Sequence, residues 1–348
     1  MNFKAVKRKV VKVSQENLVK AELFQPKQLL PLVIQPAVDG VNLITWAANN
    51  REQIETWLLR HGGILFRNFD VRSVGKFEQF IQAISGALLD YSYRSTPRSW
   101  VRGKIYTSTE YPAAQSIPLH NEMAYSLNWP RKICFFCVKV AEQGGETPIA
   151  DSRKIFQRLD PKIKDKFMQK KVLYVRNYGA NVDLTWQNVF QTTSKSDVES
   201  YCQQAGIEYE WKDSVSAAGR DSALLLRTRQ ICQAVATHPK TGETVWFNQA
   251  HLFHVSSLNP EVRQSLVSTF KEDDLPRNAY YGDGSPIEDS VLDEIRDLYQ
   301  QEAVIFPWQE GDILMLDNML AAHGRLPFLG SRKVVVGMAE PMINQKID

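Results

Sequence analysis

Two histidines and one glutamate in this sequence have the spacing of a metal site. His120 and Glu122 are separated by a single residue, and residues i and i+2 of a strand point to the same side. His323 follows an apolar run, residues 313–316, and a turn-forming Asp-Asn pair, so it can supply a third ligand from elsewhere in the chain. Two histidines and one carboxylate leave three positions of an octahedron open, as in non-haem Fe(II) oxygenases. The alternative is a surface histidine and glutamate that share no partner, and the spacing alone does not distinguish the two.

A threonine and an arginine in the same regions suit a keto acid. Thr147 lies in the run GGETP, which ends the strand after the His-x-Glu element, and Arg332 opens a strong strand nine residues after His323. An arginine fork binds both oxygens of a carboxylate at once, and a threonine offers a hydroxyl. This pair suits the distal carboxylate of 2-oxoglutarate, whose 2-oxo acid end would chelate iron and leave one position for O2.

The other histidines are expected to be structural or to contact substrate. His61 closes a predicted helix and is expected to cap its C-terminal carbonyls. His238 lies in a His-Pro-Lys-Thr-Gly turn and is expected to be exposed. His251 and His254 are three residues apart, which places them on one face of a helix, but no carboxylate lies within the next turn. A structural role or a substrate contact is therefore favoured over metal binding for this pair.

The four cysteines predict neither a disulfide framework nor a zinc site. So few in a chain of 348 residues favour a reducing, cytoplasmic setting. Cys134 and Cys137 have a zinc-like spacing, but they lie in an apolar run that is typical of a strand. Residues three apart on a strand face opposite sides, so both thiols are expected to pack in the core.

Composition excludes two broad classes of partner. The 42 basic and 39 acidic residues leave a formal net charge of +3, whereas proteins dedicated to nucleic-acid binding concentrate lysine and arginine heavily. No apolar run approaches the roughly 20 residues that cross a bilayer. We therefore expect neither a nucleic-acid nor a membrane partner.

The elements that must position these residues are mainly strands. Residues 1–40, interrupted by three prolines, predict an irregular lead-in, and residues 41–348 predict a single domain because no stretch has the composition of a flexible linker. Strands without regular βαβ alternation favour an antiparallel barrel or sandwich that carries helical insertions. Strands are predicted at 64–66, 133–140, 172–178, 207–211, 223–228, 244–248, 302–306, 312–316 and 333–338. Helices are predicted from an N-cap at 49–52 to Gly62, over 77–88, after Pro161, around 196–199, after Pro260 and across 286–300.

Three segments together resemble a known enzyme family. IPLHNEMAYS, GGETPIADSR and WQEGDILMLDNMLAAHGRLPFLGSRKVVVGMAEP are similar to the TauD/TfdA (clavaminate synthase-like) Fe(II)/2-oxoglutarate dioxygenases, and most similar to the SyrP-like branch of nonribosomal peptide pathways. The likeness runs from about residue 60 to 342. It implies a double-stranded β-helix (jelly-roll) core with helices around it. It also implies His120, Glu122 and His323 as iron ligands, with Thr147 and Arg332 as 2-oxoglutarate anchors.

The resemblance also implies a reaction. Many family members use aspartate at the middle ligand position, whereas glutamate is found in amino-acid β-hydroxylases and a small residue in halogenases, so Glu122 favours hydroxylation. The implied substrate is the β-carbon of an amino acid, for example an aspartyl residue, free or tethered to a peptidyl carrier protein. Arg98, Arg102, Arg325 and His254 are the candidate substrate contacts. Two alternatives remain open: a non-catalytic regulatory or binding protein on the same fold, and a zinc hydrolase.

Overall fold

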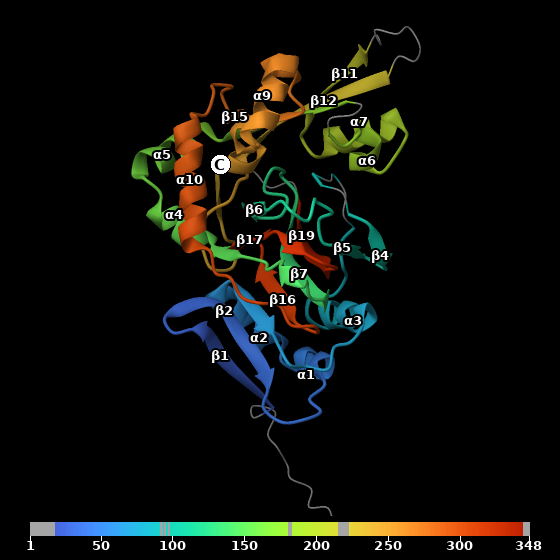
Figure 1. Cartoon of the computed structure of the whole chain (residues 1–348), viewed down its shortest axis with the longest axis vertical. Coiled ribbons are helices and arrows are strands. Elements are labelled where there is room, and N and C mark those ends of the chain that lie inside the picture. The colour runs from blue at the N-terminus through green and yellow to red at the C-terminus, as the bar shows by residue number, and fades with distance from the viewer. Residues whose placement is uncertain are drawn as a thin grey trace, which may run out of the picture.

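A large mixed sheet forms the centre of the molecule (Figure 1). The computed structural model describes residues 18–90, 93, 95–96, 98–179, 183–214 and 223–343. The sheet has eight strands, and all neighbours are antiparallel except β2 and β3. In spatial order the strands are β1 (Val19–Gln25), β2 (Gln28–Pro36), β3 (Gly63–Phe66), β16 (Ile313–Asp317), β7 (Trp129–Lys139), β19 (Lys333–Met342), β5 (Ile105–Thr107) and β4 (Trp100–Arg102).

Three shorter strands form a second, antiparallel sheet. Its order is β6 (Ile117–His120), β17 (Ala321–Arg325) and β9 (Ile149–Asp151). The chain passes from β16 of the large sheet into β17 of the small one through a turn of three residues, 318–320. The two sheets are the core of a double-stranded β-helix, so the jelly-roll prediction is confirmed.

Alternating side chains of the large sheet divide between two apolar cores. Ile133 and Phe135 of β7 pack in the core that contains the small sheet, whereas Cys134 and Phe136 pack on the opposite side. This is the period of two that a strand imposes. Cys137 belongs to the first core and Cys134 to the second, so both thiols are buried and face apart, as their spacing predicts.

Three helices cover the second face of the large sheet (Figure 1). They are α1 (Leu43–Asn49), α2 (Arg51–His61) and α3 (Val74–Ser85). Phe77 and Phe80 of α3 are fully buried, and the Phe77 ring stacks on Phe136 of β7 with the centroids 5.3 Å apart. Gly62 ends α2 with φ +76°, a left-handed conformation that glycine adopts at little cost.

The remaining elements surround the small sheet. A third sheet, also antiparallel, has the order β11, β12, β10, β15, and two further two-stranded pairs join β13 to β14 and β18 to β8. Their bounds are β8 (Gln143–Gly144), β10 (Val172–Tyr178), β11 (Glu208–Ser214), β12 (Ala223–Cys232), β13 (Val235–Thr237), β14 (Thr244–Trp246), β15 (Arg277–Tyr281) and β18 (Phe328–Leu329). The helices are α4 (Ser152–Arg158), α5 (Pro161–Lys170), α6 (Trp186–Phe190), α7 (Lys195–Gln204), α8 (Ala250–Phe253), α9 (Pro260–Thr269) and α10 (Asp289–Glu302). Among the described helices, none combines the length and the apolar character needed to cross a membrane.

Two predicted segments differ from the structure. The lead-in over 1–40 is not irregular in its described part, because β1 and β2 extend the large sheet; residues 1–17 lie outside the described residues. Leu32 and Ile34 of β2 are buried, and their burial stabilises a strand that its prolines disfavour. The prediction of a strand over 302–306 is wrong as well. Glu302 ends α10, and Val304 makes only an isolated bridge to Ile149. The other predicted strands and helices are present.

A buried ion pair joins two neighbouring strands of the large sheet and yields a stability prediction. Arg67, just after β3, donates to Asp312, just before β16, at 2.7 Å, and the Asp312 side chain is 1% exposed. Replacing Asp312 with alanine leaves a buried guanidinium without its partner, which costs about 3 kcal/mol of unfolding free energy. Urea denaturation measures the loss. The exposed Asp70→Ala control should change stability by less than about 0.5 kcal/mol, and an equally small loss for Asp312→Ala would contradict the prediction.

Candidate metal centre

The two histidines face each other across adjacent strands. His120 ends β6, and His323 lies directly opposite it in β17, with the ring centroids 4.6 Å apart. Glu122 lies two residues past the end of β6. One donor atom from each of the three side chains lies within 4.8 Å of the others. No other group of three or more such side chains able to hold a metal occurs among the described residues.

The His120 ring is oriented for metal binding through Nε2. Its Nδ1 atom lies 2.8 Å from the Pro118 carbonyl oxygen, so Nδ1–H donates there and the Nε2 lone pair is left for a metal. Burial, and then the neighbouring His323, lower the pKa of His120 to about 3. The imidazole is therefore neutral near pH 7, which is the form that binds metals.

Glu122 is an ionised carboxylate held by an arginine. The Arg98 guanidinium donates to Glu122 Oε2 at 2.6 Å, and each side chain is 3% exposed. Burial alone would raise the pKa of Glu122, but Arg98, followed by the two histidines, holds it well below its usual range. His323 Nε2 lies 3.7 Å from the same oxygen. Two imidazole nitrogens and one carboxylate oxygen are the donor set of non-haem Fe(II) sites, so these residues fit that ion.

The cavity beside the triad contains both predicted keto-acid anchors. It is lined by His120, His323, Thr147, Arg98 and Arg332, among others, and has about 30 Å³ of free space. The cavity is narrow with the side chains in this arrangement. Arg98 forms part of its wall and donates to the Glu122 carboxylate.

Thr147 and Arg332 are fixed by neighbours that leave polar hydrogens for a ligand. Thr147 Oγ1 accepts a hydrogen bond from Trp308 Nε1 at 3.1 Å, so its own hydroxyl hydrogen can be donated. Arg332 donates through Nε to the Gly145 carbonyl at 2.8 Å. Burial, and then the nearby Arg325, lower the pKa of Arg332 to about 10, which leaves it cationic at neutral pH.

Two glycines near the site allow close approaches that the sequence does not reveal. A Cβ at Gly145, which has φ +76°, would lie 2.8 Å from Arg332 Cδ. A Cβ at Gly324, next to His323, would lie 2.6 Å from the Ile117 carbonyl oxygen of β6. Larger residues would displace the anchor arginine in the first case and the β6–β17 pair in the second.

The four candidate substrate residues separate into two groups. Arg98 and Arg325 line the cavity, but Arg325 donates to the backbone carbonyls of residues 111, 112 and 115. Arg102 lies outside it, with a side chain 66% exposed beside Glu78. His254 also lies outside the cavity and bonds to Ser256. The structure thus brings Arg98 and Arg325 to the triad and does not bring Arg102 or His254 there.

Two structural histidines differ from their predicted settings. His238 is fully buried rather than exposed, because its Nε2 lies 3.1 Å from the Asp317 carboxylate. His61 does not cap its own helix; its Nδ1 bonds to the Leu29 carbonyl of β2 at 2.7 Å. In both cases a partner distant in sequence determines the environment.

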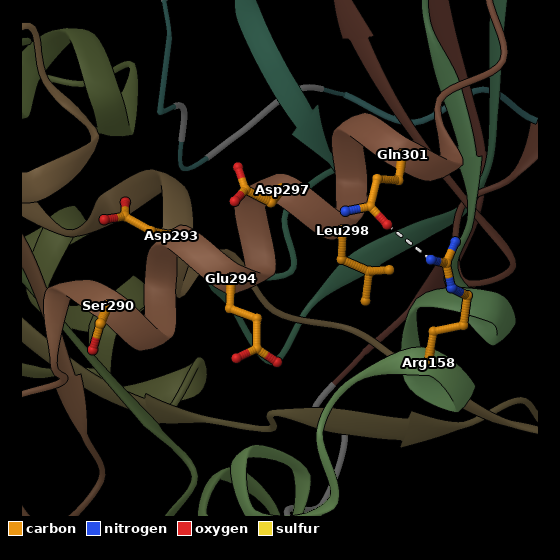
Figure 2. A pocket seen from close by; sticks show the side chains of 7 residues that line it. All are labelled: Arg158, Ser290, Asp293, Glu294, Asp297, Leu298 and Gln301. Carbon is orange, nitrogen blue, oxygen red and sulfur yellow. Dashed lines mark hydrogen bonds between the residues drawn. The ribbon is translucent and has the colours of Figure 1, made fainter.

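A larger hollow elsewhere lacks comparable chemistry. It lies along α10, measures about 480 Å³ and is lined by three acidic side chains, with Arg158 donating to Gln301 at 2.8 Å (Figure 2). Its acidic residues are not among the metal-holding groups found in the described part of the chain. The chemistry therefore lies in the small cavity beside the triad.

A jelly roll with two histidines and a carboxylate at one cavity defines the class of non-haem iron oxygenases. The family model "Taurine catabolism dioxygenase TauD, TfdA family" matches residues 26–338, and the chain belongs to this family. It is an Fe(II)- and 2-oxoglutarate-dependent oxygenase that uses O2. The predicted family and enzyme class are thus confirmed, which removes the non-catalytic and zinc-hydrolase alternatives.

Relatives and solved structures agree with this assignment. The dapdiamide synthesis protein DdaC of Enterobacter agglomerans is 40% identical over 321 residues, which are 89% of this chain and 94% of that protein. A clavaminate synthase-like protein of Arabidopsis thaliana is 27% identical over 334 residues, 92% of this chain and 93% of its own. The crystal structure of PvcB from Pseudomonas aeruginosa has the same fold, with a TM-score of 0.53, 14% identity and coverage of 97% of this chain and 94% of PvcB.

Removing one imidazole tests the triad directly. His323→Ala should weaken Mn²⁺ binding to the metal-free protein by at least about 100-fold, because two ligands cannot replace three. Electron paramagnetic resonance of free Mn²⁺ during a titration measures the affinity. The His254→Ala variant, altered outside the cavity, serves as the control and should bind like wild type. Equal Mn²⁺ affinity for wild type and His323→Ala would show that the metal lies elsewhere.

Proposed function

We propose that this enzyme hydroxylates an unactivated carbon of an amino acid, the β-carbon of an aspartyl residue in the first instance, in natural-product biosynthesis. The substrate is free or tethered to a peptidyl carrier protein. The observation that carries the proposal is the glutamate-containing triad beside one cavity with Thr147 and Arg332. The dapdiamide synthesis relative supports the biosynthetic setting.

His120, Glu122 and His323 would hold the iron. When bound, the iron with 2-oxoglutarate and O2 supplies the oxidant that inserts oxygen into a C–H bond. The protein holds the ligands in place, and it limits the access of water because Glu122 and His323 are buried and His120 is half-buried. Because Glu122 occupies the third protein position, a halide has no vacated ligand site, and oxygen insertion is favoured over halogenation.

Thr147 and Arg332 would anchor the distal carboxylate of 2-oxoglutarate. The hydroxyl hydrogen of Thr147 is available because Trp308 donates to its oxygen. Arg332, which lines the cavity, donates through Nε to the Gly145 carbonyl and through Nη1 to Ser108 Oγ, and these contacts fix its guanidinium. Two charge-assisted hydrogen bonds in a buried site give both affinity and a fixed orientation of the keto acid.

Arg98 is the favoured contact for an anionic group of the substrate. Three arginines line this cavity, and one of them, Arg98, forms an ion pair with Glu122. The distal carboxylate of the keto acid is matched by Arg332, and Arg325 is engaged with backbone carbonyls. Arg98 would therefore share its charge between Glu122 and a substrate carboxylate, as an aspartyl side chain offers.

The proposed reaction is tested with matched substrates. Iron-loaded protein, 2-oxoglutarate and O2 should convert aspartate, supplied free and as its carrier-protein thioester, to a product heavier by one oxygen atom. Mass spectrometry detects the product, and succinate is quantified in parallel to show coupling. The two forms of aspartate distinguish a free from a tethered substrate. Aspartate-dependent succinate formation without the added oxygen would contradict hydroxylation.

The anchor assignment has its own test. Arg332→Ala removes charge-assisted hydrogen bonds to a buried carboxylate and should raise the apparent KM for 2-oxoglutarate about 10- to 100-fold. Succinate formation at varied 2-oxoglutarate concentration measures the change. Arg102→Ala, altered at an exposed arginine outside the cavity, is the matched control and should leave this KM unchanged. An unaltered KM in the Arg332 variant would mean that another residue binds the distal carboxylate.

A further inference from the structure

We propose that Asn318 is a positioning residue that fixes the backbone of Glu122 relative to the strand that carries His323. The inference rests on the proposed metal site and deepens it. Asn318 touches none of the three donor atoms, and it would act through the main chain of the glutamate. Sequence reasoning identifies it only as part of a turn.

The Asn318 side chain forms a two-way hydrogen-bonded pair with the Glu122 main chain. Its Oδ1 accepts from the Glu122 N–H at 2.7 Å, and its Nδ2 donates to the Glu122 carbonyl at 2.9 Å. The second Nδ2 hydrogen goes to the Pro130 carbonyl at 2.9 Å. The amide thus uses its oxygen and both hydrogens, and the residue is fully buried.

This pair replaces a missing strand partner. β6 ends at His120. In its ladder with β17, His120 pairs with His323 and Ile117 pairs with Arg325, and the ladder does not extend to Glu122. An antiparallel partner would exchange an N–H and a C=O with Glu122, which is the exchange that the Asn318 amide makes. A side chain therefore continues the ladder by one step, to the residue that carries the carboxylate.

The segment needs such a restraint because the next residue is strained. Met123 has φ +58°, a left-handed conformation that non-glycine residues rarely adopt. Asn121 adds a further hydrogen bond between the two segments, because its Nδ2 donates to the Asn318 carbonyl at 2.7 Å. Without the hydrogen bonds from Asn318, a change of the Met123 backbone to a less strained conformation would move the Glu122 main chain and its carboxylate.

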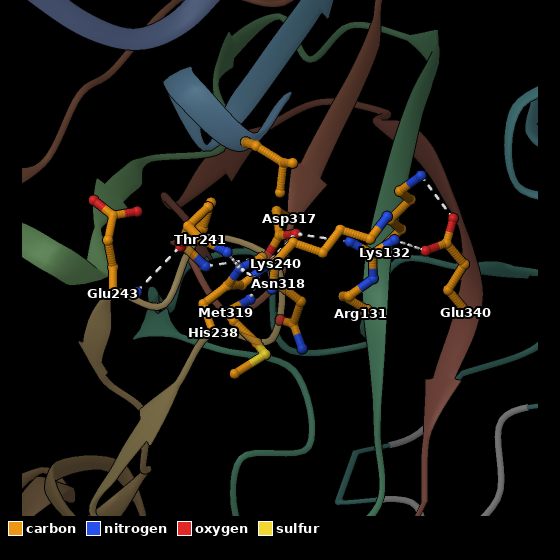
Figure 3. A network of polar contacts seen from close by, with 12 residues as sticks. Arg131, Lys132, His238, Lys240, Thr241, Glu243, Asp317, Asn318, Met319 and Glu340 are labelled. Carbon is orange, nitrogen blue, oxygen red and sulfur yellow. Dashed lines mark hydrogen bonds and ion pairs between the residues drawn. The ribbon is translucent and has the colours of Figure 1, made fainter. Parts of the chain in front are cut away.

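Asn318 is itself held in a rigid turn (Figure 3). Its N–H donates to the Arg131 carbonyl of β7 at 2.7 Å. The preceding Asp317 accepts from the N–H groups of Met319 and Leu320 and lies 3.1 Å from the buried His238 ring. Since this turn leads directly into β17, the same rigid turn fixes the positions of both Glu122 and His323.

The test measures metal affinity and the spectrum of the loaded site. Asn318→Ala should weaken Mn²⁺ binding to the metal-free protein about 10- to 100-fold, the range found when groups supporting metal ligands are removed. It should also shift or weaken the visible charge-transfer band of the anaerobic Fe(II)–2-oxoglutarate complex. Asn278→Ala is the matched control: this buried asparagine accepts from the Val255 N–H, and its loss should leave both readouts unchanged.

A second variant covers the case in which Asn318→Ala does not fold. Asn318→Asp keeps the size and the acceptor for the Glu122 N–H but loses the donors to the Glu122 and Pro130 carbonyls, so it should weaken Mn²⁺ binding in the same direction. If a folded Asn318 variant binds Mn²⁺ as tightly as wild type does, the role of Asn318 is overturned but the proposed metal site is not. Absence of Mn²⁺ binding by wild type would instead overturn the proposed metal site.

Discussion

The register between β6 and β17 is the constraint on which the rest of the site depends. His120 and His323 are direct cross-strand partners, although they come from distant parts of the chain. A slip of one residue would turn one imidazole to the opposite face of the small sheet and abolish the shared site. Gly324 helps to select the register, because a Cβ there would collide with the Ile117 carbonyl. On the other edge of β17, Ala321 and Ala322 pair with β9 and are fully buried.

Buried charge is the second constraint, and it connects stability to metal binding. Glu122 must be ionised to bind a metal, yet an uncompensated carboxylate at this depth would be strongly unfavourable. Arg98 compensates it within the protein itself. A metal that binds Glu122 then competes with Arg98 for the same oxygen, so loading the site releases part of the guanidinium's hydrogen-bonding capacity. The same arginine thus stabilises the ionised carboxylate and is the residue proposed to bind an anionic group of the substrate.

Local spacing predicted the features that local geometry determines. The opposite facing of Cys134 and Cys137, the end of α2 at Gly62 and the bounds of β10 all follow from short-range rules. Features that depend on distant partners were inaccessible: β2 is stabilised by burial against β3, and His238 is buried by Asp317. Arg98 could be proposed as a substrate contact, but its pairing with Glu122 depends on the folded chain.

The proposed metal ligands and the proposed substrate contact come from different kinds of structure. The triad and its support come from paired strands and the turn between them, and Arg332 immediately precedes β19. These positions are determined by the ladders of the jelly roll, so they tolerate little change without loss of the fold. Arg98 instead precedes β4, outside any strand, and its cavity position depends on side-chain contacts. If Arg98 contacts the substrate as proposed, a change there should alter which anion the cavity accepts while the strands that carry His120 and His323 stay paired.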